Sequence, residues 1–162
     1  MRWKANRLAG GLLKGCKERG EWAELYFMMQ AAGLGMRVSK PFNVGPFDVG
    51  VENRARVLRV QVKSTIYKRR MEEYSLNVMG PQRKMYAAGT VDFFAVLVIP
   101  VDEWYIIPYA VLGDSCGTLH LRPEGGRQVY GEYREAWYLL QQTGFTIMAC
   151  ADEEGEGSSS SE

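Results

Sequence analysis

The first part of the chain has a helical pattern of apolar positions. Between Lys14 and Ala32 they recur every three or four residues, and Gly33 follows the last turn as a C-cap. The spacing predicts an amphipathic helix over this segment. Its core-facing stripe is predicted to be Trp22, Leu25, Tyr26 and Met29.

After this helix the pattern changes to short apolar stretches of strand length. Strands are predicted at Arg37–Pro41, Phe47–Val51, Val57–Thr65, Tyr74–Val78, Phe93–Ile99, Trp104–Pro108 and Thr118–Leu121. The polar run from Glu52 to Arg56 suits a hairpin turn between the second and third strands. A short helix is predicted over Gln82–Ala88. A second helix, ending before Gly144, is predicted from the spacing of Tyr133, Ala136, Trp137 and Leu140.

This order of elements describes an α/β fold, in which a mixed sheet has helices packed on it. The 162 residues suit one domain, and a content of 46% hydrophobic and 24% charged residues is typical of a globular protein. We place this domain at residues 1–150. The tail, residues 151–162, is acidic, rich in Gly and Ser and without large apolar residues, so we predict that it is disordered.

No segment has the features of a membrane anchor or a secretion signal. The apolar stretch Leu8–Leu13 is short and is followed closely by Lys14 and Lys17. The three cysteines are widely spaced and lack a CxxC pair, so neither a disulfide framework nor a Cys-based zinc site is expected. We therefore expect a cytoplasmic protein that does not enter membranes.

Charge is unevenly distributed, although the net charge is only +1. Residues 1–70 hold 15 Lys and Arg against 5 Asp and Glu, whereas residues 71–162 hold 5 against 14. Such asymmetry favours a basic face for a polyanion such as nucleic acid. The alternative is that folding mixes the two halves and leaves no such face.

Candidate chemistry lies on the predicted hairpin. Alternation from Leu58 to Lys63 puts Leu58, Val60 and Val62 on one face and Arg59, Gln61 and Lys63 on the other. A turn centred near Arg54 brings Asp48 opposite Gln61, or one step away toward Lys63. A carboxylate, an amide and an ammonium group then converge on one face of the sheet.

These groups suit a divalent cation and a phosphodiester. Mg²⁺ binds one or two carboxylates and keeps waters that a substrate phosphate replaces. Asp48 and the Gln61 amide oxygen are the candidate ligands, and Lys63 is the candidate for orienting the attacking water. Glu24, beside the apolar stripe of the first helix, is a candidate second carboxylate. Taken singly, each has a structural alternative: Glu24 as a boundary glutamate, Asp48 as a turn residue and Lys63 as a solvated strand residue.

The order of these segments resembles the PD-(D/E)XK nuclease superfamily, in the branch with intron-encoded homing endonucleases and archaeal Holliday-junction resolvases. The similarity spans about residues 14–123. It is carried by Gly20–Glu24, Gly35–Pro41, Pro46–Asp48, Gln61–Ser64, Val91–Ala95 and Trp104–Pro108. The resemblance implies a restriction-endonuclease-like core, with a central mixed β-sheet flanked by helices.

The resemblance also implies Glu24, Asp48 and Lys63 as catalytic positions. Gln61 stands where the superfamily more often has Asp or Glu, and the homing branch is known to carry Gln there. An amide brings a dipole where a carboxylate brings a charge, so metal affinity is expected to differ. Ser64 is a candidate phosphate contact, with an ordinary surface serine as the alternative.

Two further sets of residues are candidates for contacting DNA. Lys68, Arg69 and Arg70 follow the hairpin closely and suit backbone phosphates, with a solvated loop as the alternative. Tyr67, Tyr74 and Tyr86 suit stacking on exposed bases, or packing beside strands. The only histidine, His120, has no Ser or Cys partner at motif spacing, which argues against a catalytic triad.

We therefore predict a Mg²⁺-dependent DNA endonuclease of the homing or junction-resolving type, in which Mn²⁺ substitutes for Mg²⁺. Duplex cleavage needs two sites, so a homodimer or homotetramer is expected. Two alternatives remain open. One is a catalytically inactive DNA-binding module of the same fold. The other is a structural protein whose basic half meets an acidic protein partner.

Overall fold

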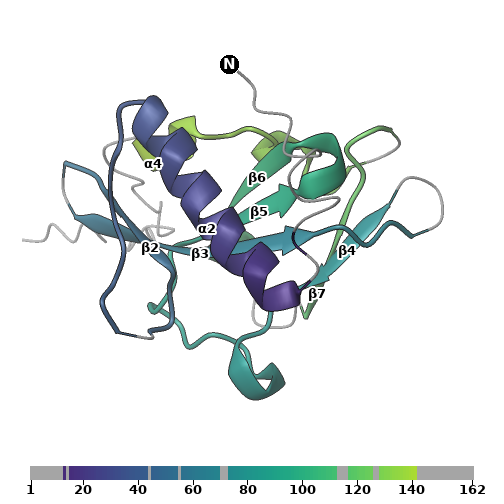
Figure 1. Cartoon of the computed structure of the whole chain (residues 1–162), viewed down its shortest axis with the longest axis horizontal. Coiled ribbons are helices and arrows are strands. Elements are labelled where there is room, and N and C mark those ends of the chain that lie inside the picture. The colour runs from purple at the N-terminus through teal and green to yellow at the C-terminus, as the bar shows by residue number, and fades with distance from the viewer. Residues whose placement is uncertain are drawn as a thin grey trace, which may run out of the picture.

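The computed structural model (Figure 1) describes residues 13, 15–43, 45–54, 56–69, 73–112, 117–125 and 128–141. Three features of the sequence analysis lie outside these residues: Arg70, the end of the second predicted helix before Gly144, and the tail, residues 151–162. No helix in the described ranges is both long enough and apolar enough to cross a bilayer.

A five-stranded mixed sheet forms the centre of the molecule, with strand order β1-β2-β3-β5-β6. The bounds are β1 Arg37–Ser39, β2 Val49–Glu52, β3 Val57–Thr65, β5 Phe93–Val98 and β6 Glu103–Pro108. β3 and β5 pair in parallel, and the other neighbours pair antiparallel. This arrangement confirms the predicted α/β fold with a central mixed sheet.

Two further strands form a small antiparallel sheet, with β4 (Tyr74–Asn77) paired to β7 (Thr118–Leu121). Both strands alternate buried and exposed positions. Tyr74, Leu76, Leu119 and Leu121 are buried. They pack in one apolar cluster with Phe94, Val96 and Val98 of β5. The small sheet therefore covers one face of the central sheet.

Helix α2 (Cys16–Gly33) covers the opposite face, which it crosses diagonally in Figure 1. The predicted apolar stripe of this helix is wrong in part, because Leu25 is 60% exposed and Met29 54% exposed. The side that packs on the sheet carries Ala23, Phe27 and Ala31, one turn apart and each fully buried. Small alanines let the helix approach the sheet closely.

Aromatic packing sets the position of α2 on the sheet. The ring of Phe27 packs with two tryptophans in a cluster of three, with its centroid 5.6 Å from that of Trp104 and 5.4 Å from that of Trp137, and the two tryptophan centroids are 5.7 Å apart. Leu58, Val60 and Val62 of β3 point into the same cluster, as the alternation predicts. Arg59, Gln61 and Lys63 are thereby directed to the opposite face of the sheet.

Two predicted helices are shorter or broken. Over Gln82–Ala88 there is only the 3₁₀ turn η2 (Pro81–Arg83), because Gln82 and Arg83 have φ of 58° and 57° and cannot continue an α-helix. The second helix is interrupted at Glu135, whose φ is 50° and whose N–H donates to the Trp104 carbonyl.

Short helical elements, none of them predicted as separate units, complete the described chain. They are η3 Ile99–Val101, α3 Tyr109–Leu112, η4 Gly131–Tyr133 and α4 Tyr138–Gln141. Three of the residues predicted for the second helix, Ala136, Trp137 and Leu140, are nevertheless buried against the sheet. The spacing of apolar residues therefore predicted correctly which residues are buried, but the helix predicted from it is too long.

Candidate active site

The β2–β3 hairpin places Asp48 directly opposite Gln61. Val49 pairs with Val60, and the N–H of Asp48 donates to the Val60 carbonyl at 3.0 Å. The turn is closed by reciprocal backbone hydrogen bonds between Asn53 and Arg56, of 2.9 and 3.1 Å. This is the first of the two registers that the sequence allows.

The carboxylate of Asp48 is held through one of its oxygens. Oδ2 accepts hydrogen bonds from the Gln61 side-chain amide and from the backbone N–H of Val62, the latter at 2.9 Å. Among the described residues, none donates a hydrogen bond to Oδ1. The neutral amide therefore fixes the carboxylate without neutralising it, and leaves the second oxygen available to a ligand.

Burial dominates the electrostatics of Asp48. It raises the pKa of this carboxyl to about 6, and the nearby charge of Glu24 adds to the increase. The Val62 hydrogen bond and the charges of Lys63 and Lys40 act in the opposite direction. A buried, incompletely compensated carboxylate is a group that gains from binding a cation.

Lys63 lies on the same face of β3 as Gln61 and is half-buried. Burial lowers its pKa, against the opposing effect of Asp48. Its ammonium nitrogen is 5.8 Å from the ring centroid of Tyr86. A lysine with this environment loses its proton more readily than a solvated one, which suits a role in proton handling.

Glu24 is half-buried on α2, and the apolar stripe used to place it was partly wrong. Its side chain is 19% exposed, and its Oε2 accepts a hydrogen bond from Lys40 Nζ at 2.7 Å. The charge of Glu24 raises the pKa of Asp48, and the charge of Lys40 lowers it. The pairing with Lys40 was not foreseen, because Lys40 comes from the segment after β1.

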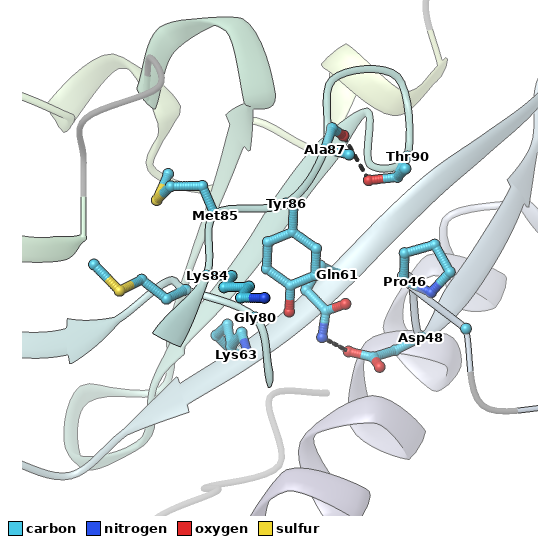
Figure 2. A pocket seen from close by; sticks show the side chains of 12 residues that line it. Pro46, Asp48, Gln61, Lys63, Gly80, Lys84, Met85, Tyr86, Ala87 and Thr90 are labelled. Carbon is cyan, nitrogen blue, oxygen red and sulfur yellow. Dashed lines mark hydrogen bonds between the residues drawn. The ribbon is translucent and has the colours of Figure 1, made fainter. Parts of the chain in front are cut away.

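Asp48, Gln61 and Lys63 lie on one wall of an open pocket (Figure 2), and the segment from Met79 to Thr90 forms the other. The lining residues are Gly45, Pro46, Asp48, Gln61, Lys63, Met79, Gly80, Lys84, Met85, Tyr86, Ala87 and Thr90. Lys84 was not predicted as part of the site, and Tyr86 was considered only for stacking on exposed bases or packing beside strands. Burial raises the pKa of Tyr86 to about 12, with a further contribution from Asp48.

The structure does not bring all the predicted DNA-contacting residues to this pocket. Ser64 pairs in register with Leu97, which points toward α2, so its side chain lies on the opposite face of the sheet from Lys63. Lys68 and Arg69 border a separate hollow with Glu73 and Arg122. Ser64, Lys68 and Arg69 are not among the residues that line the pocket.

Ion pairs link the basic residues of that second hollow. Lys68 Nζ is 3.7 Å from Glu124. Glu73 accepts from Arg122 at 2.8 and 3.1 Å and is 2.9 Å from His120 Nδ1. Arg69 is exposed, and its backbone N–H donates to the Glu73 carbonyl. Much of the positive charge here is thus offset locally.

The donor chemistry of the pocket fits a hard divalent cation. It offers the Asp48 carboxylate and the Gln61 amide, and Mg²⁺ is bound by one or two carboxylates with several waters. The carboxylate of Glu24 is near enough to raise the pKa of Asp48, but Glu24 is not among the residues that line the pocket. Within the described ranges, no three His, Cys, Asp or Glu side chains are grouped so that they could hold a metal ion together.

Comparison with known proteins places the chain in a family. Residues 15–140 match the sequence profile of the PD-(D/E)XK endonucleases, so the chain belongs to this family of nucleases, whose members use divalent metal ions. No curated protein sequence matches the chain. The fold and the family that the sequence predicts are thus both confirmed.

Two solved structures are similar. The bacterial homing endonuclease I-Ssp6803I is 25% identical with a TM-score of 0.66, over 78% of this chain and 91% of that one. The Holliday junction resolvase Hjc of Archaeoglobus fulgidus is 15% identical with a TM-score of 0.43, over 65% and 84%. The first of these supports a restriction-endonuclease-like core.

Proposed function

We propose that this chain hydrolyses phosphodiester bonds in DNA as a Mg²⁺-dependent endonuclease of the homing or junction-resolving type, with Mn²⁺ able to replace Mg²⁺. The observation that carries this function is the convergence of Asp48, Gln61 and Lys63 in one open pocket. It is supported by family membership and by similarity to a homing endonuclease.

Asp48 and Glu24 would hold the ion, with Oδ1 of Asp48 the oxygen left without a hydrogen bond from the described residues. The amide nitrogen of Gln61 faces Asp48, so a Gln61 oxygen ligand requires the amide to rotate by half a turn. The bound ion would supply Lewis acidity, which activates water and neutralises charge on phosphate oxygens.

The chain's own residues supply positioning and proton handling. Gln61 and the Val62 N–H fix the orientation of Asp48. Lys63, with its lowered pKa, is placed to orient the attacking water and to stabilise negative charge that develops on the phosphate. Each pocket has one such set of groups, so cleavage of both strands calls for a homodimer or homotetramer.

The test is incubation of the protein with duplex, four-way-junction and single-stranded DNA, with and without Mg²⁺. Asp48→Asn and Lys63→Ala should each lower the cleavage rate by roughly 100-fold or more, the scale of losing one transition-state contact. Calorimetry should find that Asp48→Asn also weakens Mg²⁺ binding, whereas Lys63→Ala retains it. Lys17→Ala, which changes a 90% exposed lysine side chain on α2, is the matched control.

The other outcomes identify the alternatives. DNA affinity that falls steeply with salt, without metal binding or cleavage, indicates an inactive DNA-binding module. Absence of salt-dependent DNA affinity indicates a structural or partner-binding protein. Unimpaired cleavage by Asp48→Asn or Lys63→Ala would remove the proposed site.

A further inference from the structure

Tyr86 enters the pocket from the wall that faces the hairpin. Figure 2 shows its ring in front of Gln61, with the hydroxyl directed toward the side of the pocket where Lys63, Gln61 and Asp48 lie. The residue comes from the irregular segment after η2, and nothing in the hairpin chemistry described above requires it. Its position calls for an explanation of its own.

Several contacts fix the orientation of this side chain. The ring of Phe94 packs edge-on against it, with centroids 5.5 Å apart. The hydroxyl of Tyr109 donates to the Tyr86 carbonyl at 2.7 Å. A Cβ at Gly80 would lie 3.3 Å from Cζ of Tyr86, so a larger residue there would require the ring tip to move by a few tenths of an ångström. Support of this kind is what holds a functional group in a defined geometry.

The Tyr86 hydroxyl is left open by these contacts. Among the described residues none forms a hydrogen bond with it, and the half-buried side chain leaves it accessible to a ligand in the pocket. A phenol keeps its proton at neutral pH and is therefore a donor. The ammonium group of Lys63 lies over its ring, 5.8 Å from the centroid, and the hydroxyl points to the side of the pocket that carries the hairpin residues (Figure 2).

We propose that Tyr86 is a further substrate-positioning residue, whose hydroxyl donates a hydrogen bond to a nonbridging oxygen of the DNA phosphodiester bound between Asp48 and Lys63. This role rests on the proposed endonuclease function. The hydrogen bond orients the phosphate toward the attacking water, and it adds a neutral donor to a pocket that already holds Lys63 and Lys84. Tyr86 acts on the substrate and not on the metal.

Tyr86→Phe tests this role, because it removes the hydroxyl and keeps the ring that packs on Phe94. The matched control is Tyr105→Phe, which removes a buried phenol hydroxyl without a hydrogen-bond partner elsewhere on the sheet. On a DNA that the wild type cleaves, Tyr86→Phe should lower kcat/KM by roughly 10- to 100-fold, the scale of a hydrogen bond to a charged group. Melting temperature and Mg²⁺ affinity should stay unchanged, and Tyr105→Phe should cleave normally.

A second readout separates phosphate contact from structural support. The same DNA is prepared with a phosphorothioate at the mapped cleavage position, as separated diastereomers, because sulfur is a weak acceptor. The rate ratio of wild type to Tyr86→Phe should fall toward one for a single diastereomer and stay high for the other.

Two results would overturn the role of Tyr86 while leaving the endonuclease function in place. One is wild-type cleavage by Tyr86→Phe, and the other is an equal ratio on both diastereomers. Absence of cleavage by the wild type would instead overturn the endonuclease function, and the role of Tyr86 with it.

Discussion

Asp48 and Asp92 lie on opposite sides of strand β3, and each accepts a hydrogen bond from a backbone N–H of that strand. Asp92 precedes β5 and accepts from Arg59 at 2.8 Å, and Asp48 precedes β2 and accepts from Val62 at 2.9 Å. Their side-chain partners differ. Asp92 accepts from the guanidinium groups of Arg59 and Arg56 at 3.0 to 3.2 Å, whereas Asp48 accepts from the neutral amide of Gln61.

Because their partners differ, the pKa values of the two carboxyl groups shift in opposite directions. Burial raises the pKa of Asp48 to about 6. Burial also acts on Asp92, but the hydrogen bonds from Arg59 and the charges of Arg56 and Arg59 outweigh it, and the pKa of Asp92 is lowered. The two aspartates have similar backbone contacts, but Asp92 belongs to a structural ion pair and Asp48 is a candidate metal ligand. They differ because Asp92 accepts hydrogen bonds from guanidinium groups, whereas the side chain that donates to Asp48 is a neutral amide.

The largest expected effect is on Asp92. Asp92→Asn leaves the half-buried Arg59 without its charge partner, so the free energy of unfolding should fall by about 3 kcal/mol at pH 7. Because the folded pKa is depressed, this contribution is present above pH 4 and is lost as the pH falls through the folded pKa. Urea denaturation at pH 7 and at pH 3 measures both. If the free energy of unfolding falls by less than about 0.5 kcal/mol at pH 7, the ion pair of Asp92 and Arg59 contributes no more than an ordinary surface ion pair.

Asp48 should respond with the opposite sign. Its folded pKa of about 6 exceeds the unfolded value, so the folded state holds the proton more tightly and stability falls as the pH rises from about 4 to 6. Asp48→Asn should therefore stabilise the metal-free protein at pH 8 by about 1 to 2 kcal/mol, a range already reduced for the openness of the pocket to solvent. The gain should vanish at pH 4. Destabilisation at pH 8 would show that Asp48 is held as tightly as Asp92.

The smallest expected effect tests the neutral partner of Asp48. Gln61→Glu adds a second charge beside the first, and at pH 8 it should tighten Mg²⁺ or Mn²⁺ binding by on the order of 1 kcal/mol. Near pH 6 the two adjacent carboxyls share a proton, and the gain should disappear. Calorimetry at the two pH values measures this. Unchanged affinity at pH 8 would mean that residue 61 does not face the metal.

The hairpin part of the site could be predicted from sequence because its geometry is local. Alternation along β3 fixes which side chains share a face, and a short turn fixes which residue faces Gln61, so Asp48 and Lys63 followed directly. The bounds of β3 match the prediction for the same reason, and those of the other strands of the central sheet differ from it by one or two residues at one or both ends. The apolar run of β5 has no alternation, since that strand is buried on both faces.

The buried side of α2 and the pocket wall that carries Tyr86 could not be predicted, because both depend on how distant segments pack together. The buried side of α2 is set by the small residues Ala23 and Ala31, which carry little hydrophobic signal beside Leu25 and Met29. Tyr86 belongs to a wall whose backbone passes through left-handed conformations at Gln82 and Arg83, and no periodicity describes such a segment. Gly80 and Gly89 are turn-forming residues of this segment, but glycines do not indicate what a turn faces.

The parallel pairing of β3 with β5 has a consequence for the order of folding. β3 meets β2 through a turn of a few residues, whereas β5 reaches β3 only after residues 66–92 have been closed into a loop. Closing the longer loop costs more chain entropy, and parallel pairings form slowly. The topology therefore favours early formation of the hairpin that carries Asp48, Gln61 and Lys63. The wall that carries Tyr86 becomes fixed later, when β5 docks and Phe94 reaches its place beneath that ring.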